Sequence, residues 1–342
     1  MRKLVLHIGM HKTGTSSIQQ TMFDNRAFLE ASGINYLSSH VNHSVPIYSL
    51  FSEAPHRYHI NVQAGFDTPD KCAVYNKTLE SRLAGLFETN TSPLFVISGE
   101  DLSVIQDGGV ERLHEFLRRY FDEIVVLGYV RPPKSFISSI VQESLKSGRH
   151  ISAQLLKEAV PNYRARFEKY FNVFGMRNVT LHLFHPERLF KHDILDDFLY
   201  RLGLSESLAE RLTRRTTNQS ISMLAGKFLH VANRTIPRFC ADDEGQLKVN
   251  VERAKSFSKI VSDLPGEKFL LPELVMNQAV DSIGADITWI EGRVGESLSQ
   301  FDIVGTDGDL DAFESFTFDE LSQISILLNQ VLKDLDASSD RK

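Results

Sequence analysis

The sequence is poor in cysteine, a residue from which many zinc and iron–sulfur sites are built. Only two of its 342 residues are cysteines, Cys72 and Cys240. They lie far apart, and their separation matches no spacing of zinc or iron–sulfur ligands. We therefore interpret them as isolated buried or surface thiols and expect no metal site in this protein.

The chain also lacks a surplus of positive charge and any long apolar run. It has 38 Lys and Arg against 44 Asp and Glu, a net charge of −6 at pH 7, which argues against a nucleic-acid partner. A membrane-spanning helix needs about 18 consecutive apolar residues, and no such run occurs. The first expected strand begins at Lys3, which leaves no room for a secretory leader. We expect a cytoplasmic protein without a transmembrane segment.

Predicted strands and helices alternate through the first two thirds of the chain. Apolar runs predict strands from Lys3 and at 34–37, 94–98, 124–130 and 179–184. Between them, periodic patterns predict helices near 15–32, 76–89, 110–120, 163–174 and 194–202. This order predicts an α/β fold with a central, mainly parallel sheet flanked by helices. Ligands of such sheets bind beyond the carboxyl ends of the strands.

The domain organisation follows from where this alternation stops. With 42% hydrophobic and 24% charged residues, the chain can bury one large core or two modest ones. We expect residues 1–204 to form the α/β core. Helical patterns then continue through 231 and at 254–264, 272–283 and 318–335, so residues 205–342 are expected to be an α-rich extension that packs on the core.

A phosphate-binding loop is predicted directly after the first strand. Gly9 and Gly14 have the spacing of the two glycines in the loop of nucleotide triphosphatases, whose backbone N–H groups and following helix bind phosphate. Those enzymes place a lysine directly after the second glycine. This chain has Thr15 there and carries its lysine earlier, as Lys12.

A second basic motif follows the strand at 124–130. Arg131 stands at the end of that strand, and Ser139 lies eight residues later in the helix expected next. A guanidinium gives a bidentate, charge-assisted grip on a phosphate, and a nearby hydroxyl adds a donor. The two motifs together resemble the donor site of sulfotransferases that use 3′-phosphoadenosine 5′-phosphosulfate (PAPS). Their amino-acid sequences are most similar to those of the bacterial members.

The resemblance implies a role for each motif residue. The run Lys12-Thr-Gly-Thr-Ser-Ser17, that is Thr13, Gly14, Thr15, Ser16 and Ser17 after the lysine, would hold the 5′-phosphosulfate, while Arg131 and Ser139 would hold the 3′-phosphate. Lys12 and the backbone N–H groups would stabilise charge on the leaving phosphate during in-line transfer. PAPS carries an already activated sulfate, so no metal is expected, unlike in kinases.

The residue that accepts the proton of the acceptor hydroxyl is harder to predict. Cytosolic relatives place a histidine after the strand that precedes the arginine strand, and Glu100 is nearest to that position here. Relatives that modify glycans place a glutamate downstream of the first loop, where this chain has His40 and His43. A histidine, with a reference pKa of ~6.5, suits this role better than a glutamate at ~4.3. We rank His43 first and Glu100 second.

Two other functions remain open at this stage. The strand at 94–98 with Glu100 and Asp101 after it would suit a P-loop kinase or NTPase with a Mg²⁺ ligand there, although the lysine after Gly14 is missing. A nucleotide-binding module without catalysis would keep the same anion loops. The acceptor is expected to be a small molecule or a glycan, with carbohydrate mildly favoured, and no pattern predicts the oligomeric state.

Overall fold

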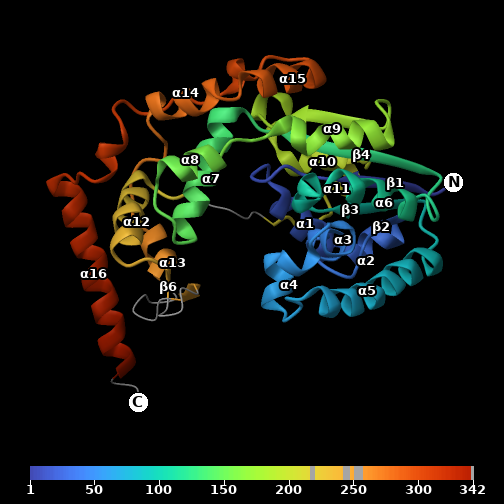
Figure 1. Ribbon diagram of the computed structural model, residues 1–342, viewed down its shortest axis with the longest axis horizontal. Coiled ribbons are helices and arrows are strands. Elements are labelled where there is room, and N and C mark those ends of the chain that lie inside the picture. The colour runs from blue at the N-terminus through green and yellow to red at the C-terminus, as the bar shows by residue number, and fades with distance from the viewer. Residues whose placement is uncertain (216–219, 242–246, 250–256, 340–342) are drawn as a thin grey trace. The chain divides into compact units, whose positions relative to one another are not determined.

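A five-stranded parallel sheet forms the centre of the fold in the computed structural model (Figure 1). Its strands are β1 (Lys3–His7), β2 (Ile34–Tyr36), β3 (Leu94–Ser98), β4 (Glu123–Val130) and β5 (Val179–Leu183). They lie in the order β2-β3-β1-β4-β5, and β1 pairs in parallel with both β3 and β4. The predicted α/β class with a parallel sheet flanked by helices is confirmed.

The structure describes residues 1–215, 220–241, 247–249 and 257–339. The chain divides into two compact units, and each is described by itself. The first consists of Met1–Pro132, Asn162–Asn218 and Ala285–Phe301, and the second of Pro133–Pro161, Gln219–Gly284 and Asp302–Lys342. The expected boundary between an α/β core and a helical extension at residue 204 stays a prediction.

Helices of the first unit cover both faces of the sheet. On one face, α1 (Thr15–Asp24), α2 (Arg26–Ala31) and α10 (Ile194–Arg201) contribute Ile18, Met22, Leu29 and Phe198 to a core cluster with Val5 and Leu127 of the sheet. On the other face lie α5 (Pro69–Thr89), α6 (Asp107–Leu117) and α9 (Tyr163–Phe174). The remaining helices of this unit are α3 (Ser44–Phe51), α4 (His59–Gln63), α11 (Glu206–Ala209) and most of α15 (Gly284–Val294), with 3₁₀ turns at Pro55–Arg57, Glu100–Val104, Pro186–Arg188, Phe190–His192 and Leu298–Phe301.

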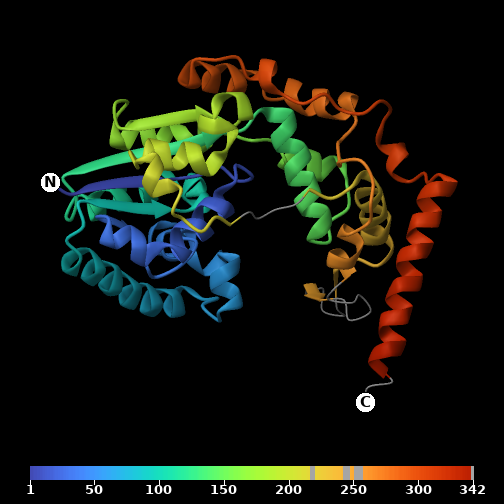
Figure 2. The same cartoon turned by 180° about the vertical axis from the view of Figure 1, so that it is seen from behind.

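The second unit is mainly helical, as Figure 2 shows from behind. It contains α7 (Pro133–Lys146), α8 (Ala153–Glu158), α12 (Met223–Thr235), α13 (Phe257–Ser262), α14 (Glu273–Asp281), α16 (Phe318–Ser339), a 3₁₀ turn at Leu310–Phe313 and the antiparallel pair β6 (Phe239–Ala241) and β7 (Leu247–Val249). Ile137, Val141, Leu229 and Phe269 belong to its core. Among the described residues, no helix combines the length and the apolar character needed to cross a lipid bilayer.

Two helices differ most from the sequence-based prediction. The helix expected over 15–32 is divided at Asn25 into α1 and α2, because the Asn25 amide group bonds to the carbonyl of Thr21 and to that of Thr213. The helix expected from residue 76 begins seven residues earlier. Its start has a proline in the first turn and the Thr68 hydroxyl accepting the Lys71 N–H, two features that favour a helix N-terminus.

The strand order places the loops after β1 and β4 where ligands of parallel sheets bind. From β1 the chain runs to β2 on one side of the sheet, and from β4 it runs to β5 on the other. Neighbouring strands whose connections leave in opposite directions create a crevice at their carboxyl ends. The Lys12 loop follows β1 and Arg131 follows β4, so both motifs lie at this crevice.

Candidate functional site

The loop after β1 has the backbone conformation of an anion-binding turn. Gly9, Lys12 and Gly14 all adopt positive φ values, of 63°, 67° and 75°. Lysine rarely takes this conformation, so Lys12 is held in it by the surrounding loop. Alternation of left- and right-handed residues turns successive N–H groups toward one side, which makes a concave site for an anion.

The end of this loop presents backbone donors at the N-terminus of α1. Gly14 is the N-cap residue, and no side chain caps the helix. In the described part of the chain, the N–H groups of Thr13, Gly14, Thr15 and Ser16 donate to no main-chain carbonyl. The Thr13 hydroxyl braces the loop by donating to the carbonyl of Met10 over 2.6 Å. Such a group of donors at the positive end of a helix dipole suits a phosphate or sulfate.

The structure brings Arg131 to the same loop. Its Nη1 lies 2.5 Å from the main-chain oxygen of Lys12 and donates a hydrogen bond to it. The carbonyl of Arg131 in turn accepts a 2.6 Å hydrogen bond from the Tyr163 hydroxyl of α9. The two predicted basic residues therefore lie at one site, with the guanidinium of one bonded to the backbone of the other.

Glu100 lies against the start of the loop. It opens the 3₁₀ turn that follows β3, and its side chain is half-buried. A Cβ atom at Gly9 would come within 2.8 Å of the Cα atom of Glu100, so the two backbones touch and only glycine fits. This packing places Glu100 beside the loop, and its role as a base stays a prediction.

His43 has a different environment from the one expected of a proton acceptor. Its side chain is fully buried, and both ring nitrogens are bonded: Nε2 donates to the carbonyl of Leu37 over 2.7 Å, and Nδ1 accepts the N–H of Ser98 over 2.9 Å. Burial lowers the pKa of His43 to about 4. His43 thus links the end of β3 to the segment before α3. Its role as a base stays a prediction, and that role would require this segment to move away from the ring.

His40 is half-buried, and its buried Nδ1 atom has no hydrogen-bond partner among the residues that the structure describes. Burial, together with the charge of Arg82, lowers the pKa of His40. Neither histidine of this pair is bonded to the residues of the loop after β1. His40 stays an alternative prediction for the base.

Ser139 lies in the second turn of α7, a helix of the second unit. Its side chain is half-buried. The predicted spacing of eight residues from Arg131 is therefore realised as a strand end followed by a helix. Binding of a 3′-phosphate by Ser139 stays a prediction.

A polar cluster that the sequence alone does not reveal adjoins the loop. His11, directly before Lys12, bonds through Nε2 to Oδ1 of Asp101 over 2.9 Å, and Tyr58 and Arg166 contact this pair. One sequence feature pointed to this cluster: Asp101 lies just after β3, the strand that pairs with β1. Tyr58 and Arg166 are remote in sequence, so only the folded chain reveals them.

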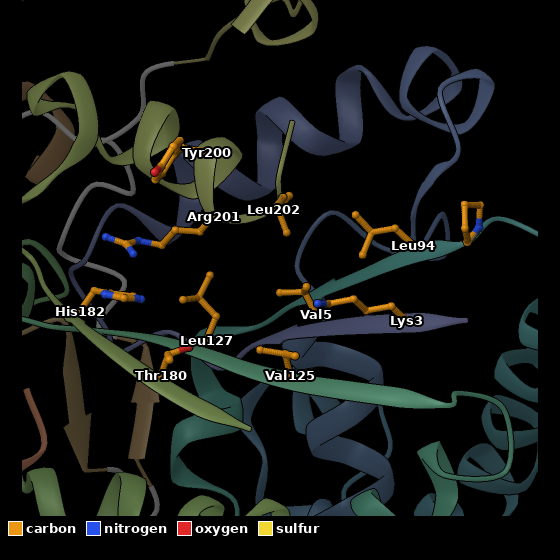
Figure 3. Close-up of a pocket in the computed structure, with 11 residues that line it drawn as sticks. Lys3, Val5, Leu94, Val125, Leu127, Thr180, His182, Tyr200, Arg201 and Leu202 are labelled. Carbon is orange, nitrogen blue, oxygen red and sulfur yellow. The ribbon is translucent and has the colours of Figure 1, made fainter. Parts of the chain in front are cut away.

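A cavity of ≈ 560 Å³ in the first unit lies at a different place (Figure 3). Figure 3 shows Lys3 and Leu94, the first residues of β1 and β3, at one end of it and His182 and Arg201 at the other. The loops with Lys12 and Arg131 follow the opposite ends of their strands. The residues that line this cavity include none from the loop after β1, so the cavity is separate from the anion-binding loop. Its arginine, Arg201, already forms a two-point ion pair with Asp197.

Comparison with known proteins gives weak likenesses only. No family model matches the chain, and no curated protein matches it. Among solved structures, a sulfotransferase from Alicyclobacillus acidocaldarius is similar with a TM-score of 0.45 and 13% identity, over 88% of this chain and 99% of the other. A sulfotransferase domain from the curacin biosynthetic pathway has a TM-score of 0.37 and 10% identity, over 83% of this chain and 98% of the other. At these scores the likeness carries no argument about function.

Proposed function

We propose that this chain is a sulfotransferase that moves a sulfuryl group from PAPS to an acceptor hydroxyl. The observation that carries the proposal is the convergence of two basic residues on one loop: the Arg131 guanidinium bonds to the backbone of Lys12, beside a helix N-terminus that no side chain caps. A nucleotide with phosphates at both the 5′ and the 3′ position needs basic groups from two strand ends. This site supplies them from β1 and β4.

The loop would bind the 5′-phosphosulfate end of the donor. The N–H groups of Thr13, Gly14, Thr15 and Ser16, with Ser17 one residue further into the helix, would donate to an anion bound at the start of α1. Lys12 would neutralise the charge that develops on the leaving phosphate, where preorganised donors stabilise a transition state most. Arg131 and Ser139 would hold the 3′-phosphate and so set the register of the nucleotide.

The transfer itself requires few other groups from the protein. PAPS supplies the activated sulfate, and the acceptor oxygen attacks the sulfur in line with the departing phosphate oxygen. A proton acceptor must lie close to the acceptor hydroxyl. His43, Glu100 and His40 were the predicted candidates, and of these Glu100 is packed directly against the loop.

A kinase or NTPase is the competing function, and the carboxylate environment counts against it. Its Mg²⁺ ligand would come from the segment after β3, where Asp101 has both carboxylate oxygens bonded, to His11 and to Tyr58. Thr15 also occupies the position of the usual lysine.

A thermal-shift comparison of three ligands tests the proposal. A ligand that binds only the folded protein raises its melting temperature. We expect adenosine 3′,5′-bisphosphate to raise it without metal, and ATP to act weakly with or without Mg²⁺. Stabilisation by ATP with Mg²⁺ but not by the bisphosphate would contradict the proposal. Stabilisation by the bisphosphate without turnover of PAPS in the presence of glycans, phenols or peptides would indicate a nucleotide-binding module.

A further inference from the structure

His11 and Asp101 form a hydrogen-bonded pair directly beside the anion-binding loop. His11 belongs to the loop itself, one residue before Lys12, and its side chain is 28% exposed. Its Nε2 lies 2.9 Å from Oδ1 of Asp101, whose side chain is 16% exposed. A carboxylate only accepts hydrogen bonds, so the Nε2 atom carries the proton and the Nδ1 atom has the lone pair.

Three segments of the first unit hold Asp101 in place. Its Oδ2 accepts a 2.7 Å hydrogen bond from the buried hydroxyl of Tyr58, and its backbone N–H donates over 3.0 Å to the hydroxyl of Ser44, at the start of α3. Burial on its own would raise the pKa of Asp101, but the hydrogen bond from His11, the positive charge that His11 carries once it is protonated, and the Tyr58 hydroxyl outweigh it and hold the pKa below its usual value. Asp101 is therefore an anion fixed in position, suited to orient an imidazole and to stabilise its protonated form.

Within the described ranges, the Nδ1 atom of His11 has only a long contact. Nη1 of Arg166, on α9, lies 3.4 Å from it and 3.1 Å from the hydroxyl of Ser103. A hydrogen bond of 3.4 Å is weak, and Arg166 keeps its bond to Ser103 when the contact to His11 is lost. A hydroxyl group can thus replace the guanidinium at Nδ1. His43 has no such opening, since it is fully buried and both of its nitrogens are strongly bonded.

We infer that His11, oriented by Asp101, is the proton acceptor for the acceptor hydroxyl. This inference rests on the proposed sulfuryl transfer. The hydroxyl proton moves to Nδ1 of His11, while the acceptor oxygen forms its bond to the sulfur of PAPS. The bond between that sulfur and the 5′-phosphate oxygen breaks, and its electron pair stays on the phosphate oxygen. Lys12 and the loop N–H groups stabilise the negative charge that results. Asp101 acts as a positioning residue.

His11 lies in the anion-binding loop itself, which brings its side chain close to a group bound there. Consecutive Cα atoms are about 3.8 Å apart, so a group bound to the N–H donors after Lys12 lies within reach of the preceding side chain. A base has to come within about 2.6–3.2 Å of the oxygen whose proton it removes.

The test uses PAPS with water as the acceptor, because water needs no knowledge of the natural substrate. Release of adenosine 3′,5′-bisphosphate is followed by chromatography with enzyme in excess. His11→Gln keeps a donor for Asp101 but cannot take the proton, and should slow hydrolysis at least 100-fold with bisphosphate affinity changed less than threefold. Asp101→Asn should slow it about tenfold or more. His150→Gln, at an exposed position of the second unit, is the matched control and should hydrolyse PAPS at the wild-type rate.

Chemical rescue separates a proton acceptor from a structural histidine. Added imidazole should restore part of the rate in His11→Ala and none in Asp101→Asn. Hydrolysis by His11→Gln at the wild-type rate, or a wild type that binds the bisphosphate without accelerating hydrolysis, would overturn the inference. If the wild type does not bind the bisphosphate at all, the proposed function fails instead, so the two failures are distinguishable.

Discussion

The guanidinium of Arg131 bonds to the main-chain carbonyl of Lys12, across 119 positions of sequence. Lys12 has a left-handed backbone conformation, and this bond helps to hold its carbonyl and side chain in place. The end of β4 thereby fixes the loop after β1. A change at either residue should alter the other half of the anion-binding site, which allows the site to be tested by substitution.

Gly9→Ala should destabilise the protein and weaken anion binding. The φ of Gly9 is +63°, and a Cβ atom there would lie 2.8 Å from the Cα atom of Glu100. Gly203→Ala is the matched control, because Gly203 has a φ of +79° and a Cβ atom added there would meet nothing within 4 Å. Each variant loses about 1 kcal/mol from backbone strain, and Gly9→Ala should lose at least about 1 kcal/mol more. Urea unfolding measures the free energy of unfolding of both variants. Equal losses would show that the backbone near Glu100 moves to accommodate the added methyl group.

Lys12→Met should lower turnover far more than nucleotide affinity. The substitution keeps the length of the side chain but removes the charge that would stabilise the leaving phosphate, and loss of such a group typically costs about 10²–10³ in kcat. Single-turnover hydrolysis of PAPS measures the rate, and calorimetry measures binding of the bisphosphate. Lys157→Met, at an exposed position on α8, is the control. A normal rate for Lys12→Met would remove Lys12 from the mechanism.

His43→Ala should act on stability. The variant leaves a buried cavity. It also removes the two ring nitrogens, so the carbonyl of Leu37 and the N–H of Ser98 lose their hydrogen-bond partner. The free energy of unfolding should therefore fall by about 2–4 kcal/mol. The rate of PAPS hydrolysis per folded molecule should stay near that of the wild type. A loss of at least 100-fold in that rate, with unchanged bisphosphate affinity, would instead restore His43 as the base.

The protein should lose stability as the pH falls below about 6.5. Burial lowers the pKa of His7 to about 3 and that of His43 to about 4, from 6.5 when the chain is unfolded. Above pH 6.5 both residues are neutral in either state and have no effect. At lower pH the unfolded chain takes up protons that the folded protein excludes, so stability declines until the pH reaches the folded values.

Substitution of His7 isolates this effect from the titration of carboxylates. Between pH 7 and pH 4.5, His7→Gln should lose about 2–3 kcal/mol less unfolding free energy than the wild type, from 1.36 kcal/mol per pKa unit. His150→Gln, at an exposed site, should match the wild type. Urea unfolding at the two pH values measures the difference. An equal loss in His7→Gln and the wild type would show that His7 takes up a proton in the folded state.

The sequence allowed the sheet and the loop to be predicted because both depend on local patterns. The strand at 94–98 and the helix at 163–174 were placed at the residues where the structure has them, since apolar periodicity decides such elements. The two glycines of the loop were identified by their spacing, and they do adopt positive φ values. Local chemistry was enough for these features.

The environment of each histidine could not be predicted in the same way. His43 was ranked first as a base for its residue type and its place in a loop, but β3 and the segment before α3 enclose it and bond both of its nitrogens. His11 was not predicted as a base, because its partner Asp101 lies 90 residues away in sequence. In the folded protein the two side chains are only 2.9 Å apart. Burial and hydrogen bonding are set by such distant contacts, which a single sequence does not reveal.

The central claim is that Lys12 and Arg131 bind opposite ends of one doubly phosphorylated adenosine. Calorimetry should compare adenosine 3′,5′-bisphosphate with adenosine 5′-monophosphate in the wild type, in Arg131→Ala and in the exposed control Arg164→Ala. The wild type and the control should prefer the bisphosphate by at least tenfold, since a charge-assisted bond contributes about 1.5–3 kcal/mol. In Arg131→Ala the two ligands should bind almost equally. A wild type that binds both ligands equally well, or an Arg131→Ala variant that keeps the full preference, would contradict it.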